Sequence, residues 1–162
     1  MIVVSDSTAL IGLSAIGGLD WLRQIYTSVV IPQAVYGEVV IDGAGKAGSQ
    51  DVAKASWIQT QAIQNLNDKT FLMSVVGLDE GESEALVLAQ ESGADLLLLD
   101  DAAARKYARQ QQLKFTGMVG VVLAAKQTGI ITLARPQLDA LIAAGIFIDT
   151  KLYQQACQSV SE

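Results

Sequence analysis

The sequence contains no histidine, and its 162 residues include a single cysteine, Cys157. Without histidine, the chain cannot build a Ser-His-Asp or Cys-His nucleophile system or a histidine-ligated zinc site. One cysteine also excludes an internal disulfide framework and a zinc knuckle. If the protein is an enzyme, its ionisable chemistry must therefore use carboxylates, lysines, arginines or tyrosines.

Long apolar runs are also missing. No stretch reaches the roughly 18 uncharged apolar residues that a membrane-spanning helix requires, so we expect no membrane contact. The segment "ALIGLSAIGGL" has the apolar character of a secretory signal, but no basic residue precedes it. We therefore interpret it as part of the folded chain and, given the single cysteine, expect a reducing, cytoplasmic location.

An excess of positive charge is absent as well. The formal net charge is −6, which disfavours broad, non-specific binding to a phosphate backbone because like charges repel. The same charge leaves room for a local basic face, or for a nucleic-acid site whose carboxylates are neutralised by a metal ion.

The residues that are abundant indicate an α/β protein. Hydrophobic residues make up 51% of the chain and aromatic residues only 6%, with Leu, Ile, Val and Ala dominating. This composition is typical of a parallel sheet that helices cover on both faces. Short apolar runs predict strands at 1–5, 28–32, 55–63, 96–99 and 114–117.

Helical patterns separate these runs. Apolar spacing predicts helices at 8–22, 32–40, 78–93, 101–113, 118–129, 135–145 and 150–160, with a glycine-rich loop at 41–50. Gly17 and Gly18 weaken or break the first helix, and Gly93 is expected to end the third. Because strands and helices alternate, we predict a single domain, 1–162, with a three-layer α/β/α fold and a central, mainly parallel sheet. Residues 132–162 are expected to form a helical C-terminal tail.

Acidic residues follow the predicted strands. Asp6 ends the first strand, and Asp100 and Asp101 directly follow the four-leucine run. Glu38 lies in the second predicted helix, and Glu84 lies near the start of the third. Active sites of open parallel sheets gather beyond the carboxyl ends of the strands. We therefore treat these carboxylates as candidate members of one site that the core partly encloses.

A divalent cation would allow such carboxylates to lie together. Carboxylates brought close repel each other and raise one another's pKa, and a bound cation removes that conflict. Mg²⁺ and Mn²⁺ prefer oxygen ligands, and a water that they retain can become a nucleophile toward a phosphodiester. The hydroxyls of Ser7 and Thr8 are candidates for orienting Asp6 or such a water. A chain without histidine can therefore still hydrolyse a phosphodiester.

Each acidic residue also has a purely structural interpretation. Asp6 and Asp101 are good helix N-caps, and Glu82 and Glu84 are acids of a first helical turn, which the helix dipole favours. Glu38, taken alone, fits a solvated helix position. Only the convergence of these side chains in space separates a site from this alternative.

The order of these segments resembles the PIN domain, the ribonuclease fold of many bacterial toxins in toxin–antitoxin pairs. "VVSDSTALIGL" is similar to the opening strand of the family with its Asp, and "VIPQAVYGEVV" to the motif in which a Glu follows a Pro-led helix start. "GESEALVLA" and "LLLLDDAAARKYA" resemble the third and fourth motifs, an acid at a helix start and an acidic strand end. Together with "TGMVGVVLAAKQTGII", the resemblance covers residues 1 to about 150 and points to a prokaryotic PIN-like subgroup.

The resemblance also assigns roles to residues of this sequence. It implies a catalytic set of Asp6, Glu38, Glu84 and Asp101. It implies that Mg²⁺ or Mn²⁺ is held by Asp6, Glu84, Asp101 and the neighbouring Asp100, with Thr8 and Ser7 as supporting hydroxyls. "GESE" offers Glu82 as well as Glu84, and we favour Glu84 because it directly precedes the apolar "ALVLA" pattern.

Basic residues cluster on the helix predicted after Asp101. Arg105, Lys106 and Arg109 lie on it, and Lys114 follows. We predict that Arg105 and Lys106 contact RNA. Arg105 lies one turn beyond Asp101, where it could hold an RNA phosphate or orient a carboxylate. The alternative is a solvated helix face with cations toward its C-terminal half.

The function implied by the resemblance is a metal-dependent endoribonuclease that hydrolyses phosphodiester bonds of single-stranded RNA. Family members of this kind are often homodimers and act as the toxin of a pair with a small antitoxin protein, and we expect the same here. Two alternatives stay open. One is a non-catalytic PIN-like α/β binding module whose acids are helix caps. The other is a metal-dependent nuclease acting on DNA, since the acidic residues alone do not distinguish RNA from DNA.

Overall fold

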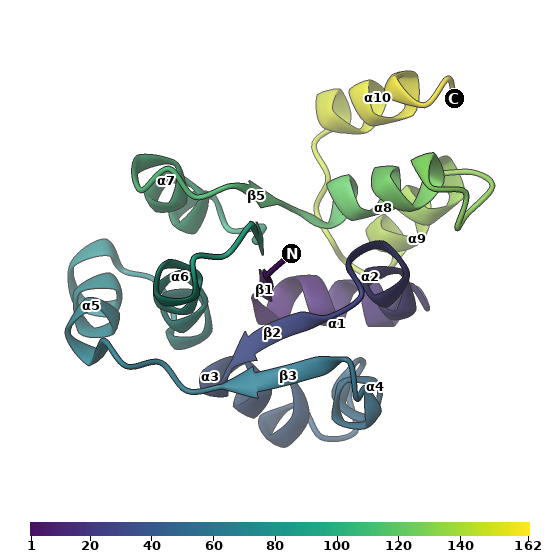
Figure 1. The fold of residues 1–162 in the computed structure, drawn as a ribbon. Helices are drawn as coiled ribbons and strands as arrows, with labels where there is room; N and C mark the ends of the chain where they lie inside the picture. The colour runs from purple at the N-terminus through teal and green to yellow at the C-terminus, as the bar shows by residue number, and fades with distance from the viewer.

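A five-stranded sheet forms the centre of the computed structural model, which describes all residues from 1 to 162 (Figure 1). Its strands are β1 (Val3–Ser5), β2 (Val29–Pro32), β3 (Ile58–Gln61), β4 (Leu96–Leu98) and β5 (Phe115–Thr116). They lie in the order β3-β2-β1-β4-β5, and every adjacent pair is parallel. The predicted strands and the three-layer α/β/α fold are therefore confirmed.

Alternate residues of the central strands bury the two faces of the sheet. Val3 of β1 and Leu98 of β4 pack into one hydrophobic core, whereas Val4 and Leu97 pack into the other. Successive side chains of a strand point to opposite faces, so a strand between two helical layers has no solvent-facing position. This explains why the sequences of β1 and β4 are apolar without alternation.

Helices form a layer on each face. The larger core underlies α1 (Ser7–Ala15), α2 (Leu19–Tyr26), α8 (Met118–Gln127), α9 (Arg135–Ala143) and α10 (Thr150–Ser159). The opposite layer contains α6 (Glu80–Ser92) and α7 (Ala102–Gln110), with α5 (Leu66–Phe71) and the π-helical segment η2 (Leu72–Val76) beside α6. After β2 come α3 (Gln33–Tyr36), the π-helical segment η1 (Gly37–Asp42) and α4 (Ser49–Lys54).

Glycine sets two of the helix boundaries where the sequence predicts them. Gly17 has a φ of +72° and separates α1 from α2, and Gly93 has a φ of +60° and ends α6. Glycine adopts this left-handed conformation without the steric cost that other residues carry. The break after α1 returns the chain to the same layer, where α2 packs against both α1 and α8.

Three segments differ from the prediction. Pro32 is the last residue of β2 and precedes α3 instead of starting it, because a ψ of 165° keeps Pro32 extended. The loop predicted at 41–50 is shorter, since η1 runs to Asp42 and α4 begins at Ser49. Helix α5 buries none of its residues, so no apolar period marked it in the sequence.

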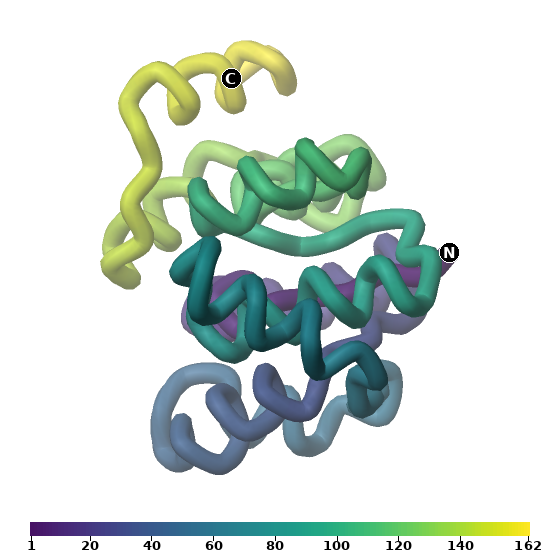
Figure 2. The backbone as a smooth tube through the Cα atoms, turned by 90° about the vertical axis from the view of Figure 1, so that its left-hand side faces the viewer, coloured from purple at the N-terminus to yellow at the C-terminus, as the bar shows by residue number.

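The C-terminal helices pack onto the layer that contains α1 and α8. Leu138 and Leu141 of α9 and Ala156 and Cys157 of α10 are buried in that core. Residues 144–149 join the two helices without regular structure and run along the left edge of Figure 2. None of the helices combines the length and the apolar character needed to cross a membrane.

Candidate active site

Two acidic segments meet where the strand order of the sheet reverses. Because β1 lies between β2 and β4, the carboxyl ends of β1 and β4 are neighbours. Asp6 follows β1 directly, and its backbone N–H donates to the carbonyl oxygen of Leu98 at 3.1 Å. Asp100 and Asp101 follow β4 after one intervening leucine. Open parallel sheets bind ligands at such a switch point, beyond the carboxyl ends of the strands.

Asp6 is the most enclosed of these acids, with a relative exposure of 1%. Its Oδ1 accepts the backbone N–H of Ala9 at 3.0 Å and caps α1. Its Oδ2 is buried as well and makes no hydrogen bond of ordinary geometry, although the backbone N–H of Asp100 lies near enough to lower the pKa of the carboxyl group. Burial is the main cause that raises the pKa of Asp6 to about 7, and the charges of Asp100 and Glu82 act in the same direction. An unpartnered buried carboxylate oxygen is costly unless a proton or a cation neutralises it.

Asp100 lies between Arg105 and the start of α8. Its Oδ1 is 3.4 Å from Nη2 of Arg105, and its two oxygens lie 3.3 and 3.2 Å from the backbone nitrogen of Met118. Arg105 is fixed in turn, since its Nε donates to the carbonyl oxygen of Leu99 at 2.6 Å. Burial raises the pKa of Asp100, although the Arg105 charge opposes this shift. The geometry matches one of the two roles considered for Arg105, the orientation of a carboxylate.

Glu82 faces the same edge from the start of α6. Its Oε2 accepts the backbone N–H of Asp79 at 3.1 Å, and Oδ1 of Asp79 accepts the N–H of Glu82 at 2.7 Å, which makes a capping box. Burial raises the pKa of Glu82, and the charges of Asp79, Asp101 and Glu38 add to the shift. Asp101 caps α7 through Oδ1, which accepts the N–H of Ala104 at 2.8 Å. Glu82 and Asp101 therefore each keep one oxygen free of protein donors.

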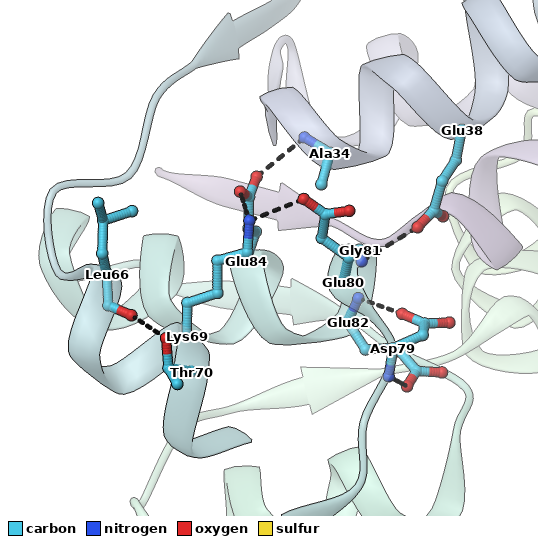
Figure 3. A network of polar contacts seen from close by, with 10 residues as sticks. All are labelled: Ala34, Glu38, Leu66, Lys69, Thr70, Asp79, Glu80, Gly81, Glu82 and Glu84. Atoms are coloured by element: carbon cyan, nitrogen blue, oxygen red, sulfur yellow. Dashed lines mark hydrogen bonds and ion pairs between the residues drawn. The ribbon is translucent and has the colours of Figure 1, made fainter. Parts of the chain in front are cut away.

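Glu38 lies on η1 and is tied to two other helices. Its Oε1 accepts the N–H of Gly81 at 3.0 Å, as Figure 3 shows, and its Oε2 accepts the hydroxyl of Ser7. A Cβ at position 81 would lie 2.7 Å from both carboxylate oxygens, so glycine is what lets Glu38 approach α6. Glu38 is thus not a freely solvated residue. Ser7 donates to Glu38, whereas the sequence analysis suggested Asp6 or a metal-bound water as its partner.

Glu84 points away from Glu38 and Glu82 (Figure 3). Its Oε2 accepts the N–H of Ala34 at the start of α3 at 2.9 Å, and its Oε1 pairs with Nζ of Lys69 at 2.8 Å. Lys69 also pairs with Glu80 at 2.7 Å. Both oxygens of Glu84 are therefore used to join α6 to α3 and α5. The structure does not bring Glu84 into the acidic group, and Glu82 occupies the place that the sequence analysis gave to Glu84.

The start of α6 explains this correction. The helix begins at Glu80 after the cap Asp79, so Glu84 lies in its second turn instead of its first. Residues two apart on a helix point roughly 200° away from each other, so Glu82 and Glu84 cannot face the same edge. The capping pair of Asp79 and Glu82 was the signal in the sequence that fixes which acid lies at the helix start.

A cavity of about 330 Å³ opens where the acids meet. Thr8, Glu82, Asp100 and Asp101 line its polar side, and Met118 and Phe147 line its apolar side. Thr8 is exposed, two residues after Asp6, at the place where the sequence analysis put a supporting hydroxyl. No three acidic, cysteine or histidine side chains lie close enough together to hold a metal ion as a cluster.

The oxygen donors nevertheless suit a hard divalent cation. Mg²⁺ and Mn²⁺ prefer carboxylate oxygens and water, and the polar side of the cavity presents only carboxylates and a hydroxyl. Mg²⁺ retains several waters and commonly takes only one or two protein carboxylates, so a closed cluster of three is not required. The buried Oδ2 of Asp6 gives the clearest indication of a cation site, because no hydrogen bond of ordinary geometry satisfies this oxygen and a bound cation would do so.

The residues predicted to contact RNA lie on α7, the helix that Asp101 caps. Lys106 is exposed, whereas Arg105 is partly buried against Asp100. The guanidinium carbons of Arg105 and Arg109 lie 5.5 and 5.4 Å from the centre of the Phe115 ring. Both cations therefore stack on one ring, and Arg105 also reaches the acidic edge through Asp100.

The structure is an α/β domain whose parallel sheet has carboxylates beyond its central strands. The PIN-domain family model matches residues 2–162 of the chain. The chain therefore belongs to the PIN-domain family, as its four motifs suggested. PIN domains are generally nucleases and typically use divalent metal ions. No curated protein matches the chain at a significant level.

Gly117→Ala is expected to disturb this edge. An added Cβ would lie 2.1 Å from Nη2 of Arg105 and 2.2 Å from Oδ1 of Asp100, so both side chains must move. We expect the free energy of unfolding to fall by about 1–2 kcal/mol, measured by urea denaturation. Gly37→Ala is the matched control, because its φ of −57° is helical and nothing lies within 4 Å of an added Cβ. Equal losses in both variants would contradict the prediction.

Proposed function

We propose that this PIN-domain protein is a metal-dependent endoribonuclease that hydrolyses phosphodiester bonds of single-stranded RNA with Mg²⁺ or Mn²⁺. The observation that carries the proposal is the buried, unpartnered Oδ2 of Asp6 at the point where two strands end. Glu82, Asp100 and Asp101 line the adjacent cavity and add negative charge at the same edge. Membership of a family whose members are generally nucleases supports it.

The residues at the acidic edge of the sheet have distinct roles in this proposal. One or two of the carboxylates of Asp6, Glu82, Asp100 and Asp101 would hold the cation directly, and the others would bind its waters. One oxygen of Glu82 and one of Asp101 accept no hydrogen bond from the protein. Arg105 fixes the orientation of Asp100, and Thr8 orients the attacking water from the exposed rim. A bound cation supplies charge neutralisation and Lewis acidity toward a phosphodiester oxygen. Water adds to phosphorus as one P–O bond breaks, which leaves a phosphomonoester and a hydroxyl end.

The test is cleavage of an end-labelled single-stranded RNA by the purified protein in Mg²⁺, Mn²⁺ or EDTA. We expect internal cleavage with either metal and none in EDTA. An Asp6→Asn preparation purified in the same way controls for contaminating nucleases and should be inactive. Cleavage that persists in EDTA or in Asp6→Asn would contradict the proposal, and preferential cleavage of a matched DNA strand would favour the DNA alternative.

A non-catalytic binding module is the second candidate function. It is favoured by the helix-capping bonds of Asp6 and Asp101 and by the lack of a three-carboxylate cluster. Such a module would bind RNA equally well in Mg²⁺ and in EDTA and would cut nothing. A toxin role, a small antitoxin partner, a homodimer and a cytoplasmic location stay predictions. Growth arrest on expression of this chain alone, relieved by a small protein encoded beside it, would support the toxin role.

A further inference from the structure

A second cavity adjoins the acidic one on its apolar side. It has a volume of about 680 Å³ and lies between α7, β5, α8 and the 144–149 connection. Asp100, Met118, Ile146 and Phe147 line both cavities, so the two adjoin along these residues. We call the second cavity the aromatic groove. A strand whose phosphate lies at the acids would reach the aromatic groove with a neighbouring nucleotide.

Phe147 is the most exposed large apolar side chain of the protein, with a relative exposure of 89%. It lies between Ile146 and Ile148, which both pack against the core beneath α1 and α8. Successive side chains of an irregular, extended segment alternate in direction, so anchoring the two isoleucines turns Phe147 outward. An aromatic ring fixed in solvent at the border of two cavities is a surface for a flat, apolar ligand.

The opposite wall of the aromatic groove combines a cation with a second ring. Arg105 stacks on Phe115 at 5.5 Å from the ring centre, and both residues line the groove. Asp149 also lines it, but its Oδ2 accepts the backbone N–H groups of Lys151 and Leu152 and caps α10. Exposed aromatic rings beside arginine are the features with which proteins bind unpaired nucleotides, the ring stacking on a base and the cation facing the backbone.

We propose that the aromatic groove binds an unpaired nucleobase of the strand whose phosphate lies at the acidic cavity, with Phe147 as the stacking platform. This inference rests on the proposed function, because it takes the acidic cavity as the phosphate site. The shared border of the two cavities and the arginine beside a ring favour this occupant over an apolar protein segment. A base in a duplex is already stacked on both faces, so the groove selects single strands.

The experiment measures binding separately from cleavage. Fluorescence anisotropy with a labelled single-stranded RNA, a matched DNA strand and an abasic strand is carried out in the Asp6→Asn background with Mg²⁺, where no cleavage is expected. Phe147→Ala should weaken binding of the base-containing strands about 5- to 100-fold and leave the abasic strand unchanged, the range expected for one stacked base. Phe147→Trp should restore binding, and its added indole fluorescence should be quenched by the bound base.

Phe71→Ala is the matched control, since Phe71 is 47% exposed on α5, in the layer on the other face of the sheet. Equal binding by Phe147→Ala and Phe71→Ala, equal losses for intact and abasic strands, or no binding of any strand would overturn the proposal. Loss of self-association in Phe147→Ala with unchanged RNA binding would assign the ring to a second copy of the chain and overturn it too. Base-dependent binding without cleavage by the unmodified protein would refute the nuclease and leave this inference standing.

Discussion

Asp6→Asn is expected to lower RNA cleavage by at least about 100-fold and, in the same molecule, to stabilise the metal-free fold. Activity falls because the variant loses the one buried carboxylate oxygen that makes no hydrogen bond of ordinary geometry. Stability rises because asparagine keeps the oxygen that caps α1 at Ala9 but carries no charge into the core. A shift of the Asp6 pKa from 3.8 to about 7 corresponds to a penalty of about 4 kcal/mol on the charged side chain above pH 7, which asparagine removes.

The pH dependence of this difference follows from the direction of the shift. Between 3.8 and about 7, the folded protein binds more protons at Asp6 than the unfolded chain does. The stability of the unsubstituted protein therefore falls as the pH rises through this window, and the penalty is complete above pH 7. The advantage of Asp6→Asn should be largest there and should vanish near pH 4. Urea unfolding of both proteins in EDTA, from about pH 4 to above pH 7, measures this difference in stability.

Asp20→Asn is the control for removing an aspartate charge. Asp20 is exposed, and its hydrogen bond and 2.7 Å ion pair with Arg23 lower its pKa, the opposite direction to Asp6. Neutralising Asp20 should therefore bring no gain in stability at any pH and no loss of cleavage. If Asp6→Asn were less stable than the unsubstituted protein in EDTA above pH 7, the charge of Asp6 would have a structural role and the site assignment would fail.

Glu82→Gln and Glu84→Gln are expected to have opposite consequences, although one residue separates them. Glutamine at 82 can still accept the N–H of Asp79, since capping boxes use Glu or Gln, so the free energy of unfolding should change by less than about 0.5 kcal/mol. Its charge is lost from the acidic edge, so cleavage should fall about 10- to 100-fold. Glutamine at 84 loses its ion pair with Lys69 on a side chain only 9% exposed, which should cost about 1–3 kcal/mol.

The two readouts separate the roles of these glutamates. Thermal unfolding should show a loss of stability only in Glu84→Gln. RNA cleavage, measured well below the melting temperature, should show a loss of activity only in Glu82→Gln. The double variant should combine both losses without coupling, because Glu82 and Glu84 share no partner. If Glu84→Gln lost cleavage and kept its melting temperature, the original preference for Glu84 would be restored.

Much of the fold could be predicted from the sequence because its central strands are buried on both sides. Such strands carry no polar residue until they end, so the positions of Asp6 and Asp101 follow from the apolar runs alone. The choice between Glu82 and Glu84 required the first residue of α6, and helix starts are set by capping bonds that apolar periodicity does not report. The partner of Ser7 and the outward direction of Phe147 depend on packing between distant segments, which no local pattern contains.

The connection at 144–149 has a consequence for how this protein can diverge. It lies between two helices that each bury two residues in the core, and it contributes no strand to the sheet. Substitutions of its exposed Phe147 therefore alter the surface offered to a ligand without loosening the central strands. The acids, in contrast, are positioned by the least exposed part of the molecule. The residue proposed to bind the nucleotide and the acids proposed to cleave RNA thus lie in separate segments of the chain. Varying Phe147 within this connection, and leaving Ile146, Ile148 and Asp149 untouched, is a direct route to variants with new nucleotide preferences.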